Sequence, residues 1–276
     1  MATAFFGYLL PWGQMSYWGA QVIVSLFGAI PVVGESLVEW IRGDYFISDI
    51  TLNRFFALHV IALPLVLVGL VAVHIIALHE VGSNNPDGIE IKEKKGPDGV
   101  PLDGIPFHPY HTAKDLVAFV AFAIVFAAIV FFAPEMGGYF LEHANFEAAD
   151  PLKTPEHIAP VWYFTPFYAI LRAVPDKLGG VILMGSAMIL LFFLPWLDRS
   201  PVRSVRYRGW MFKLALAVFV VSFIVLGFLG TQPATGAYTI MARIFTVLYF
   251  AFFLLMPIYT KLEKTKPVPE RVTYHG

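Results

Sequence analysis

The chain has 276 residues, of which 58% are apolar and 14% charged, with a formal net charge of −1 and no cysteine. An ordinary soluble domain is about 45–50% apolar and about 25% charged, so this composition excludes a soluble enzyme, a disordered chain and a nucleic-acid-binding protein. Without cysteine there is no disulfide, iron–sulfur ligand, thiolate zinc site or covalent c-type haem attachment. The class that remains is an integral membrane protein.

The first predicted elements are short. Residues 2–10 have the composition of the last turns of an apolar helix, which the following Pro11-Trp12-Gly13 ends. Residues 16–27 and 35–42 are rich in aromatic and branched side chains and are predicted to be short interfacial helices.

Five apolar runs follow, each close to the roughly 20 residues that a helix needs to cross a membrane. They cover residues 55–78, 116–133, 178–197, 214–230 and 239–260. The predicted fold class is therefore all-α integral membrane, with five complete transmembrane helices, the end of a sixth, and short interfacial helices.

Lys and Arg residues predict the orientation of these spans. Three connections, residues 81–115, 198–213 and the C-terminal tail from Lys261, hold most of the 19 basic residues. Five spans place all three on one side, which the basic excess predicts to be cytoplasmic. The opposite, acidic and aromatic side receives residues 11–53, 134–177 and 231–238.

Two histidines, His59 and His74, lie 15 residues apart in the first complete span. At about 100° per residue they share one helix face, separated by about 22 Å along the axis. Ionisable groups at membrane depth are costly and usually functional, and two stacked imidazoles are typical of a two-haem electron pathway. Interhelical hydrogen bonding and a proton relay are the alternatives. A relay would favour mid-membrane carboxylates, which this span lacks.

Four motifs occur in order along the chain. They are GYLLPWGQMSYWGA from Gly7, RFFALH from Arg54 continuing to LHEVGSNNP from Leu78, PFHPYHTAKD from Pro106, and PVWYFTPFYAILR from Pro160. Together they resemble the late third helix, the fourth helix, the entry to the fifth and the quinol-site segment of cytochrome b, the membrane core of ubiquinol–cytochrome c reductase. The resemblance covers essentially the whole chain, which makes a chance match very unlikely.

The resemblance implies a role for each candidate residue. His59 would be an axial ligand of a low-potential haem on the positive side, and His74 of a high-potential haem on the negative side. The quinone-reducing site would contain His79, Ser83, Lys114 and Asp115. The quinol-oxidising site would be lined by Tyr8, Gly19, Trp162, Tyr163 and Tyr168.

The function implied is that of an electron-transfer subunit of a quinol–cytochrome c oxidoreductase. Ubiquinol would be oxidised on the positive side, electrons would pass through two b-type haems, and ubiquinone would be reduced on the negative side, coupled to proton translocation. The implied partners are a Rieske iron–sulfur protein, a c-type cytochrome subunit and a second copy in a homodimer. The expected location is the bacterial inner membrane, with the quinone-reducing side and the C-terminus cytoplasmic.

One departure from the family concerns proton transfer. Val161 stands where the family usually has a glutamate that is thought to accept a proton from quinol. We hypothesise that Glu156, or Tyr163 with water, takes its place. A second departure is the histidine spacing, which is 14 residues in many mitochondrial relatives and 15 here. The longer spacing, together with continuous spans across residues 53–134, indicates the undivided bacterial type.

A third departure is at the N-terminus. The family has two helices and most of a third before the position of Tyr8, and the second helix supplies the other axial histidine of each haem. No candidates for these ligands occur in this chain, because the remaining histidines fall in loops or the tail: His108, His111, His143, His157 and His275. We therefore expect a fragment, or a gene model started at an internal Met; a split protein completed by a second polypeptide is the less favoured alternative.

The expected organisation has three parts. Residues 1–86 would form the C-terminal part of the haem-binding bundle, residues 87–112 a cytoplasmic loop, and residues 113–276 a C-terminal domain of four helices with the quinol-site loop. The alternative functions are a non-redox membrane transporter that uses His59 and His74, and an inactive truncated fragment that binds no haem.

Overall fold

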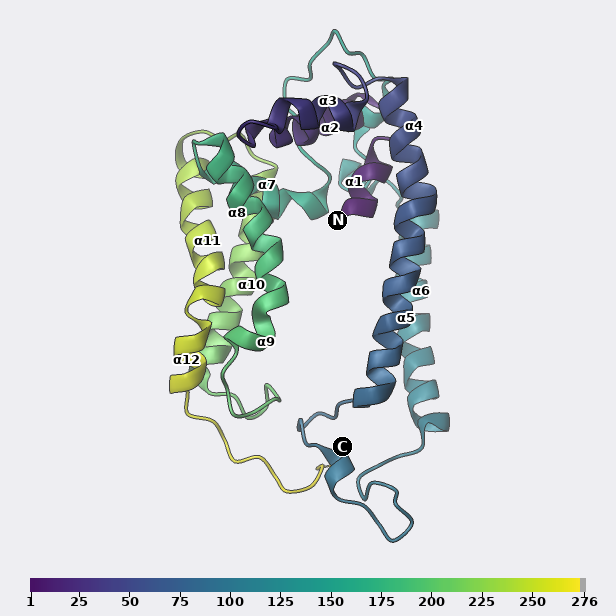
Figure 1. Ribbon diagram of the computed structural model, residues 1–276, viewed down its shortest axis with the longest axis vertical. Helices are drawn as coiled ribbons and strands as arrows, with labels where there is room; N and C mark the ends of the chain where they lie inside the picture. Colours follow the sequence, from purple (N-terminus) through teal and green to yellow (C-terminus); the bar gives the residue numbers. More distant parts are fainter. Residues whose placement is uncertain (274–276) are drawn as a thin grey trace.

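The computed structural model describes residues 1–273, and its regular structure in this part is helical, apart from two isolated β-bridges. Five helical segments are long and apolar enough to cross a membrane, as predicted: Asp49–Val81, Phe107–Phe132, Lys177–Leu197, Trp210–Gly230 and Gly236–Leu254. Figure 1 shows them running along the long axis of the molecule, with shorter helices lying across one end. The predicted all-α membrane fold is confirmed.

The first span combines α4 (Asp49–Ala57), a π-helical turn (Leu58–Ala62) and α5 (Leu63–Val81). It begins earlier than the apolar run predicts, because Ser48 at its N-terminus donates its backbone N–H to Thr51 Oγ1 at 3.1 Å. This bond starts the helix within a polar sequence. The second span is a π-helical turn (Phe107–His111) followed by α6 (Thr112–Phe132).

Proline interrupts the third and fifth spans. The third consists of α8 (Lys177–Ile189), a 3₁₀ turn (Leu190–Phe193) and α9 (Leu194–Leu197), which has Pro195 in its first turn. The fifth, predicted as one helix over 239–260, divides into α11 (Gly236–Leu254) and α12 (Met256–Leu262), which has Pro257 in its first turn. Proline lacks the N–H that the preceding turn requires, so the helix tightens or breaks there. The fourth span, α10 (Trp210–Gly230), is uninterrupted.

The N-terminal helices pack across one end of the molecule (Figure 1). They are α1 (Ala2–Tyr8), α2 (Gln14–Leu26) and α3 (Gly34–Arg42). With α4 they enclose a small core that includes Leu9, Tyr17, Val24 and Phe55. The transverse orientation of α2 and α3 agrees with the interfacial helices that the sequence predicts.

The main core lies between α7 (Thr165–Ala173), α8, α10 and α11. Tyr249, Phe252 and Phe253 of α11 form its aromatic centre, and the Tyr249 hydroxyl donates to the carbonyl of Ala187 at 2.8 Å. Glycines allow the helices to approach closely, since a Cβ on Gly230 would lie 2.1 Å from Thr165 O. The short 3₁₀ turns among the connections are Phe27–Ala29, Ile91–Glu93, Met136–Gly138, His143–Phe146 and Trp162–Phe164.

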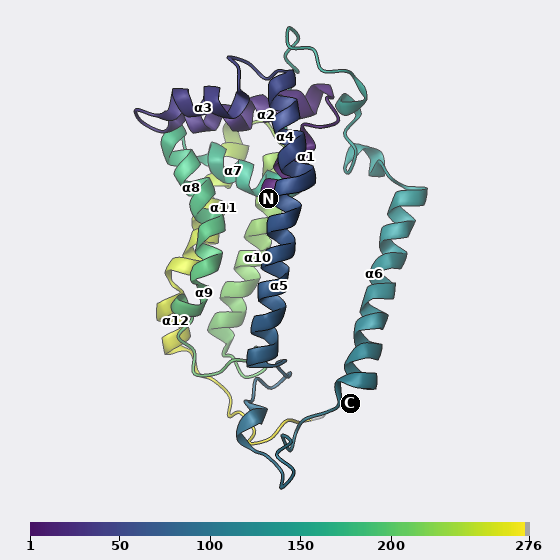
Figure 2. The same ribbon diagram turned by 45° about the vertical axis from the view of Figure 1, so that its right-hand side comes forward.

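Two spans bury almost no side chain against the rest of the described chain. Neither α5 nor α6 contains a buried residue, and Figure 2 shows α6 standing apart from the other helices. Their exposed side chains are Leu, Val, Ile and Phe along the whole length. Such surfaces are stable only against lipid or other apolar helices.

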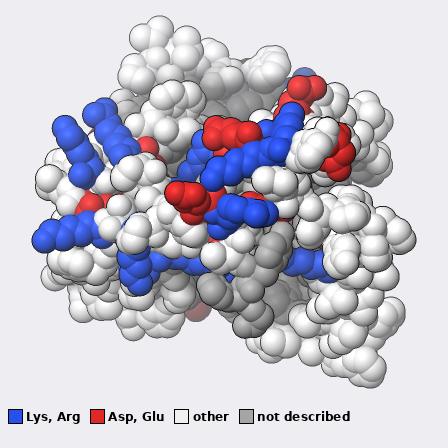
Figure 3. All heavy atoms as spheres, turned by 90° about the horizontal axis from the view of Figure 1, so that it is seen from below, with Lys and Arg blue, Asp and Glu red and all other residues white. Residues whose placement is uncertain are grey.

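The end of the molecule opposite α2 and α3 carries basic side chains (Figure 3). Arg208 is 4% exposed there and donates to Glu263 at 2.6 Å and to Asp198 at 2.7 Å. These bonds attach the segment after α12 to the loop before α10. The expected concentration of basic residues on one side of the spans is thus present in the fold.

Candidate functional site

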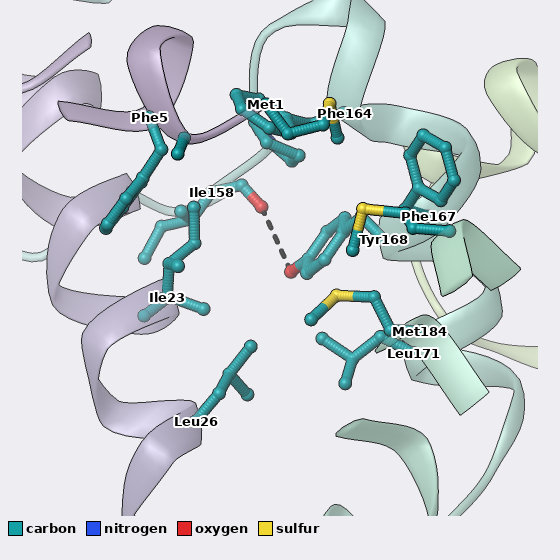
Figure 4. A pocket seen from close by; sticks show the side chains of 15 residues that line it. Met1, Phe5, Ile23, Leu26, Ile158, Phe164, Phe167, Tyr168, Leu171 and Met184 are labelled. Atoms are coloured by element: carbon teal, nitrogen blue, oxygen red, sulfur yellow. Dashed lines mark hydrogen bonds between the residues drawn. The ribbon is translucent and has the colours of Figure 1, made fainter. Parts of the chain in front are cut away.

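An apolar cavity of about 170 Å³ lies between α1, α2, α7 and α8, beneath the transverse helices (Figure 4). Ile23 and Leu26 of α2 form one wall, and Tyr168 and Leu171 of α7 form the facing wall. The Tyr168 hydroxyl donates to the carbonyl of Ile158 at 3.5 Å. Methionines and aromatic rings complete the lining, so the cavity suits a flat, apolar ring: Met1, Phe5, Phe164, Phe167, Met184 and Met188.

Two of the five residues predicted for the quinol-oxidising site line this cavity, and two more lie close to it. Gly19 and Tyr168 line it. Tyr8 lies behind Gly19, since a Cβ on Gly19 would be 3.4 Å from Tyr8 Cε1. Tyr163 follows in the adjoining 3₁₀ turn and interacts electrostatically with Tyr8. Trp162 lies further out, 42% exposed and stacked on the ring of Tyr139 at 5.9 Å.

A polar network that the sequence did not reveal borders the cavity. The Tyr8 hydroxyl donates to Glu142 Oε2 in a short hydrogen bond. Asn145 Nδ2 donates to the Tyr8 hydroxyl at 3.2 Å and to Glu142 Oε2 at 3.5 Å. Burial raises the pKa of the Glu142 carboxyl, and the hydrogen bond from Tyr8 opposes that shift. Burial, followed by the nearby Glu142 charge, also raises the pKa of Tyr163.

The loop carrying Glu142 is held against the start of α2. The Gln14 amide N–H donates to Glu147 O at 2.9 Å, and the Ser16 amide donates to Asn145 Oδ1 at 2.8 Å. Gly13 is required at this contact, because a Cβ there would lie 2.6 Å from the Asn145 backbone. A separation of 134 residues between Tyr8 and Glu142 explains why no motif links them.

The remaining residues expected near this site lie elsewhere. Val161 is 6% exposed and places no carboxylate in the segment. Glu156 is exposed on the preceding connection. His157, on the same connection, contacts Thr231 O through Nε2 at 3.0 Å.

His59 lies in the π-helical turn of the first span and faces α1. Its Nδ1 is 2.8 Å from the carbonyl of Thr3, which leaves Nε2 as the free ring nitrogen. Gly7 provides the space, since a Cβ there would lie 2.3 Å from His59 Cε1. An imidazole held through Nδ1 by a backbone carbonyl, with Nε2 free, is the usual arrangement of a metal-ligating histidine.

His74 lies on the exposed face of α5. Because the π turn takes up an extra residue, the rotation from His59 is close to that of 14 regular residues, about 40° short of four turns. That the two histidines share one helix face stays a prediction of the sequence. Within residues 1–273 no three His, Asp or Glu side chains cluster as metal ligands. His275 lies outside the described residues.

A second cavity of about 850 Å³, whose lining mixes charged and apolar side chains and which is termed the polar cavity, lies at the opposite, basic end of the molecule. It is lined by the turn after α5, the start of α6, the loop before α10 and the C-terminal segment at Thr273. Of the residues predicted for the quinone-reducing site, Ser83 and Lys114 line this cavity. His79 and Asp115 do not, although Asp115 adjoins Lys114 and His79 lies in the last turn of α5.

These features define a class: a multi-span helical membrane protein with an apolar cavity near one membrane surface, a polar cavity near the other, and paired histidines on the span between them. Residues 1–166 match the family model described as "Cytochrome b(N-terminal)/b6/petB", and residues 148–250 match "Cytochrome b(C-terminal)/b6/petD". The chain belongs to the cytochrome b family.

Individual cytochrome b proteins are similar to the chain over nearly its whole length. The chain is 66% identical to cytochrome b of Allochromatium vinosum, covering 99% of this chain and 68% of that protein. It is 51% identical to cytochrome b of Rickettsia bellii, covering 99% of this chain and 65% of that protein. The solved "Hyperthermophilic respiratory Complex III" superposes with a TM-score of 0.85 at 40% identity, over 95% of this chain and 67% of that chain. The chain therefore spans about two thirds of the length of these relatives.

Proposed function

We propose that this chain is the quinone-binding, electron-carrying core of a quinol–cytochrome c oxidoreductase. The observation that carries the proposal is the pair of cavities at opposite ends of the molecule, joined by the span with His59 and His74. Residues 1–86 would belong to the haem-binding bundle, and residues 113–276 to the second domain that closes the quinol site.

The apolar cavity is the quinol-oxidising site in this proposal. Gly19 leaves room for a ring against α2, and Tyr168 presents an aromatic face across from it. Trp162 and Tyr163 pack edge to face in the turn that precedes α7. An aromatic enclosure with few polar groups binds a quinol ring and excludes water, which directs its protons to the groups at the wall.

His59 and His74 are the haem ligands in this proposal. A bound b-type haem supplies reversible one-electron redox chemistry. The residues fit such a group: His59 presents a free Nε2, Thr3 O holds its Nδ1, and Gly7 leaves a space that any larger side chain would fill. His74 faces outward from α5, where no described side chain covers it.

The polar cavity is the quinone-reducing site. Reducing a quinone consumes two protons, so the site requires groups that bind carbonyl oxygens and deliver protons. Ser83 and Lys114 offer hydrogen bonds from the lining, and His79 and Asp115 supply an imidazole and a carboxylate at its edge.

The complex around the chain is also part of the proposal. The solved relative is titled respiratory Complex III, which supports an assembly with a Rieske iron–sulfur protein and a c-type cytochrome, and we propose a homodimer. The chain has no cysteine, so iron–sulfur and c-type centres belong to those partners. The location is the bacterial inner membrane, with the basic end cytoplasmic and ubiquinone as the substrate.

The test is a reduced-minus-oxidised difference spectrum of membranes that contain the assembled complex. We expect a b-type haem band in the wild type, with part of it lost in His59→Ala and another part in His74→Ala. His157→Ala is the matched control, because His157 lies in a connecting loop, and it should leave the band intact. A wild-type complex without a b-type band, or histidine variants that leave it unchanged, would refute the proposal.

A further inference from the structure

The quinol-oxidising cavity has no carboxylate in its lining. Oxidising a quinol releases two protons, and Val161 offers no acceptor in the segment that closes the site. The Glu142 carboxylate is hydrogen-bonded to Tyr8, which packs behind the lining residue Gly19. Glu142 belongs to the loop between α6 and α7, outside the four sequence motifs.

We infer that Glu142 accepts a proton of the quinol through the hydroxyl group of Tyr8. This inference rests on the proposed function and specifies how the same site disposes of its protons. Glu142 itself does not line the cavity, so its action depends on Tyr8 as the intermediate group.

Contacts lead from the cavity lining to Glu142. Gly19 lines the cavity, and the Tyr8 ring packs behind it at 3.4 Å from the position of a Gly19 Cβ. The Tyr8 hydroxyl is hydrogen-bonded to Glu142 Oε2. Asn145 fixes both partners through Nδ2, and its Oδ1 is anchored by the Ser16 amide at 2.8 Å. The path is thus preorganised before substrate binds.

The transfer of this proton leaves Tyr8 in its original protonation state. A quinol O–H bond breaks as a new O–H bond forms on Tyr8, and the original Tyr8 O–H bond breaks as Glu142 Oε2 gains its proton. Both electrons leave the quinol, one for an iron–sulfur protein of the complex and one for a b-type haem, and the second quinol proton leaves with the electron that the iron–sulfur protein accepts. The product is a neutral Glu142 beside an unchanged tyrosine.

Glu142 is also placed to release the proton. Its side chain is only partly buried, and its neighbours Leu141 and His143 are exposed on the same loop. That loop lies at the transverse-helix end of the molecule, away from the basic face (Figure 1). The proton therefore leaves on the side opposite to the polar cavity.

The charge of Glu142 sets the expected pH dependence. The groups that face it are Tyr8 from α1, Asn145 from its own loop and Tyr163 from the turn before α7. Only an ionised Glu142 can accept a proton, so the rate should fall as pH drops through its pKa. Burial raises that pKa, which moves the loss of activity to a higher pH than an exposed carboxylate would give.

The experiment measures quinol-dependent haem reduction in membranes containing the complex, as a function of pH. Glu142→Gln removes the acceptor and keeps the shape, Glu142→Asp keeps the carboxylate, and Tyr8→Phe removes the relay. The control is Glu147→Gln, which makes the same charge change at an exposed site of the same loop. The difference spectrum checks assembly in each variant.

We expect Glu142→Gln and Tyr8→Phe to be at least about a hundredfold slower, the low end for general acid–base catalysis, and to lose the fall in rate at low pH that the wild type shows. Glu142→Asp should retain the fall in rate at low pH, and Glu147→Gln should show the wild-type rate and pH dependence. Full activity in Glu142→Gln, an unchanged fall in rate at low pH in that variant, or loss of that fall in Glu156→Gln instead would overturn the relay. A wild-type complex whose haem is not reduced by quinol would overturn the proposed function itself.

Discussion

At the scale of single residues, the contact between Gly7 and His59 determines where the imidazole of the first span lies. The ring occupies space that only glycine leaves open, and Thr3 O holds its Nδ1. Hydrogen-bond partners of a ligating histidine fix its orientation, so a displaced ring weakens the bond to a metal.

Gly7→Ala is therefore expected to displace the His59 ring, because the new methyl group would lie 2.3 Å from Cε1. Loss of such outer-shell support commonly lowers metal affinity about 10–100-fold. Redox titration of membranes should show the His59-associated haem component diminished and the His74 component retained. Gly28→Ala is the control, since its Cβ would meet Val38 at an ordinary 3.6 Å. A titration that is the same in all three proteins would contradict this role of Gly7.

At the scale of elements, the crossing of α7 and α10 positions the apolar cavity. α7 begins at Thr165, whose hydroxyl donates to Trp162 O at 2.7 Å, and this residue packs directly on Gly230. Arg172 at the other end of α7 donates to Leu229 O and Gly230 O at 3.0 and 3.1 Å. Both ends of the helix that carries Tyr168 are thus fixed to the last turn of α10.

Gly230→Ala should force α7 and α10 apart, because its Cβ would lie 2.1 Å from Thr165 O. Overpacking of this kind costs about 1–3 kcal/mol. Thermal unfolding in detergent should show a lower Tm than the wild type. Gly227→Ala, one turn earlier with its Cβ 3.6 Å from Pro166, should have the wild-type Tm or slightly above it. Equal destabilisation by both substitutions would indicate that the close crossing is not responsible.

At the scale of the whole molecule, Asp87 joins segments that are far apart in the chain. Its carboxylate is buried and accepts hydrogen bonds from Tyr207 at 2.6 Å, Arg206 at 3.1 Å and the Thr273 amide at 2.8 Å. These bonds, that of Tyr207 foremost, hold the pKa of Asp87 well below its usual range. The loop after α5, the loop before α10 and the C-terminal segment meet at this one group.

Because the pKa of Asp87 is lowered in the fold, the attachment of the C-terminal segment is predicted to weaken in acid. A carboxyl whose pKa is lower in the folded state stabilises the fold above its unfolded pKa of about 3.9, and this stabilisation is lost as pH falls below that value. Asp87→Asn should release the C-terminal segment at neutral pH, seen as faster amide exchange around Thr273. Asp98→Asn, on an exposed loop, is the control. Amides around Thr273 that exchange equally slowly in Asp87→Asn and in the wild type would refute the attachment.

Much of this architecture follows from local sequence. The five spans were predictable because lipid requires long apolar helices. Their ends were misplaced at Ser48 and Pro257, which act on the backbone, and at the second span, which begins at Phe107 and not at residue 116. Tyr8, Gly19 and Tyr168 were assignable through motifs. Glu142 was not, because its role depends on a contact across 134 residues, and nothing in its neighbouring sequence marks it. The separate position of α6 likewise depends on long-range packing.

The π-helical turn at Leu58–Ala62 has an evolutionary consequence. A turn that takes up one extra residue lets an insertion occur without rotating the rest of the span. The 15-residue interval between the histidines, against 14 in many mitochondrial relatives, can then be a neutral change in length. Selection would act on the direction in which the two rings point, while the count of residues between them is free to drift.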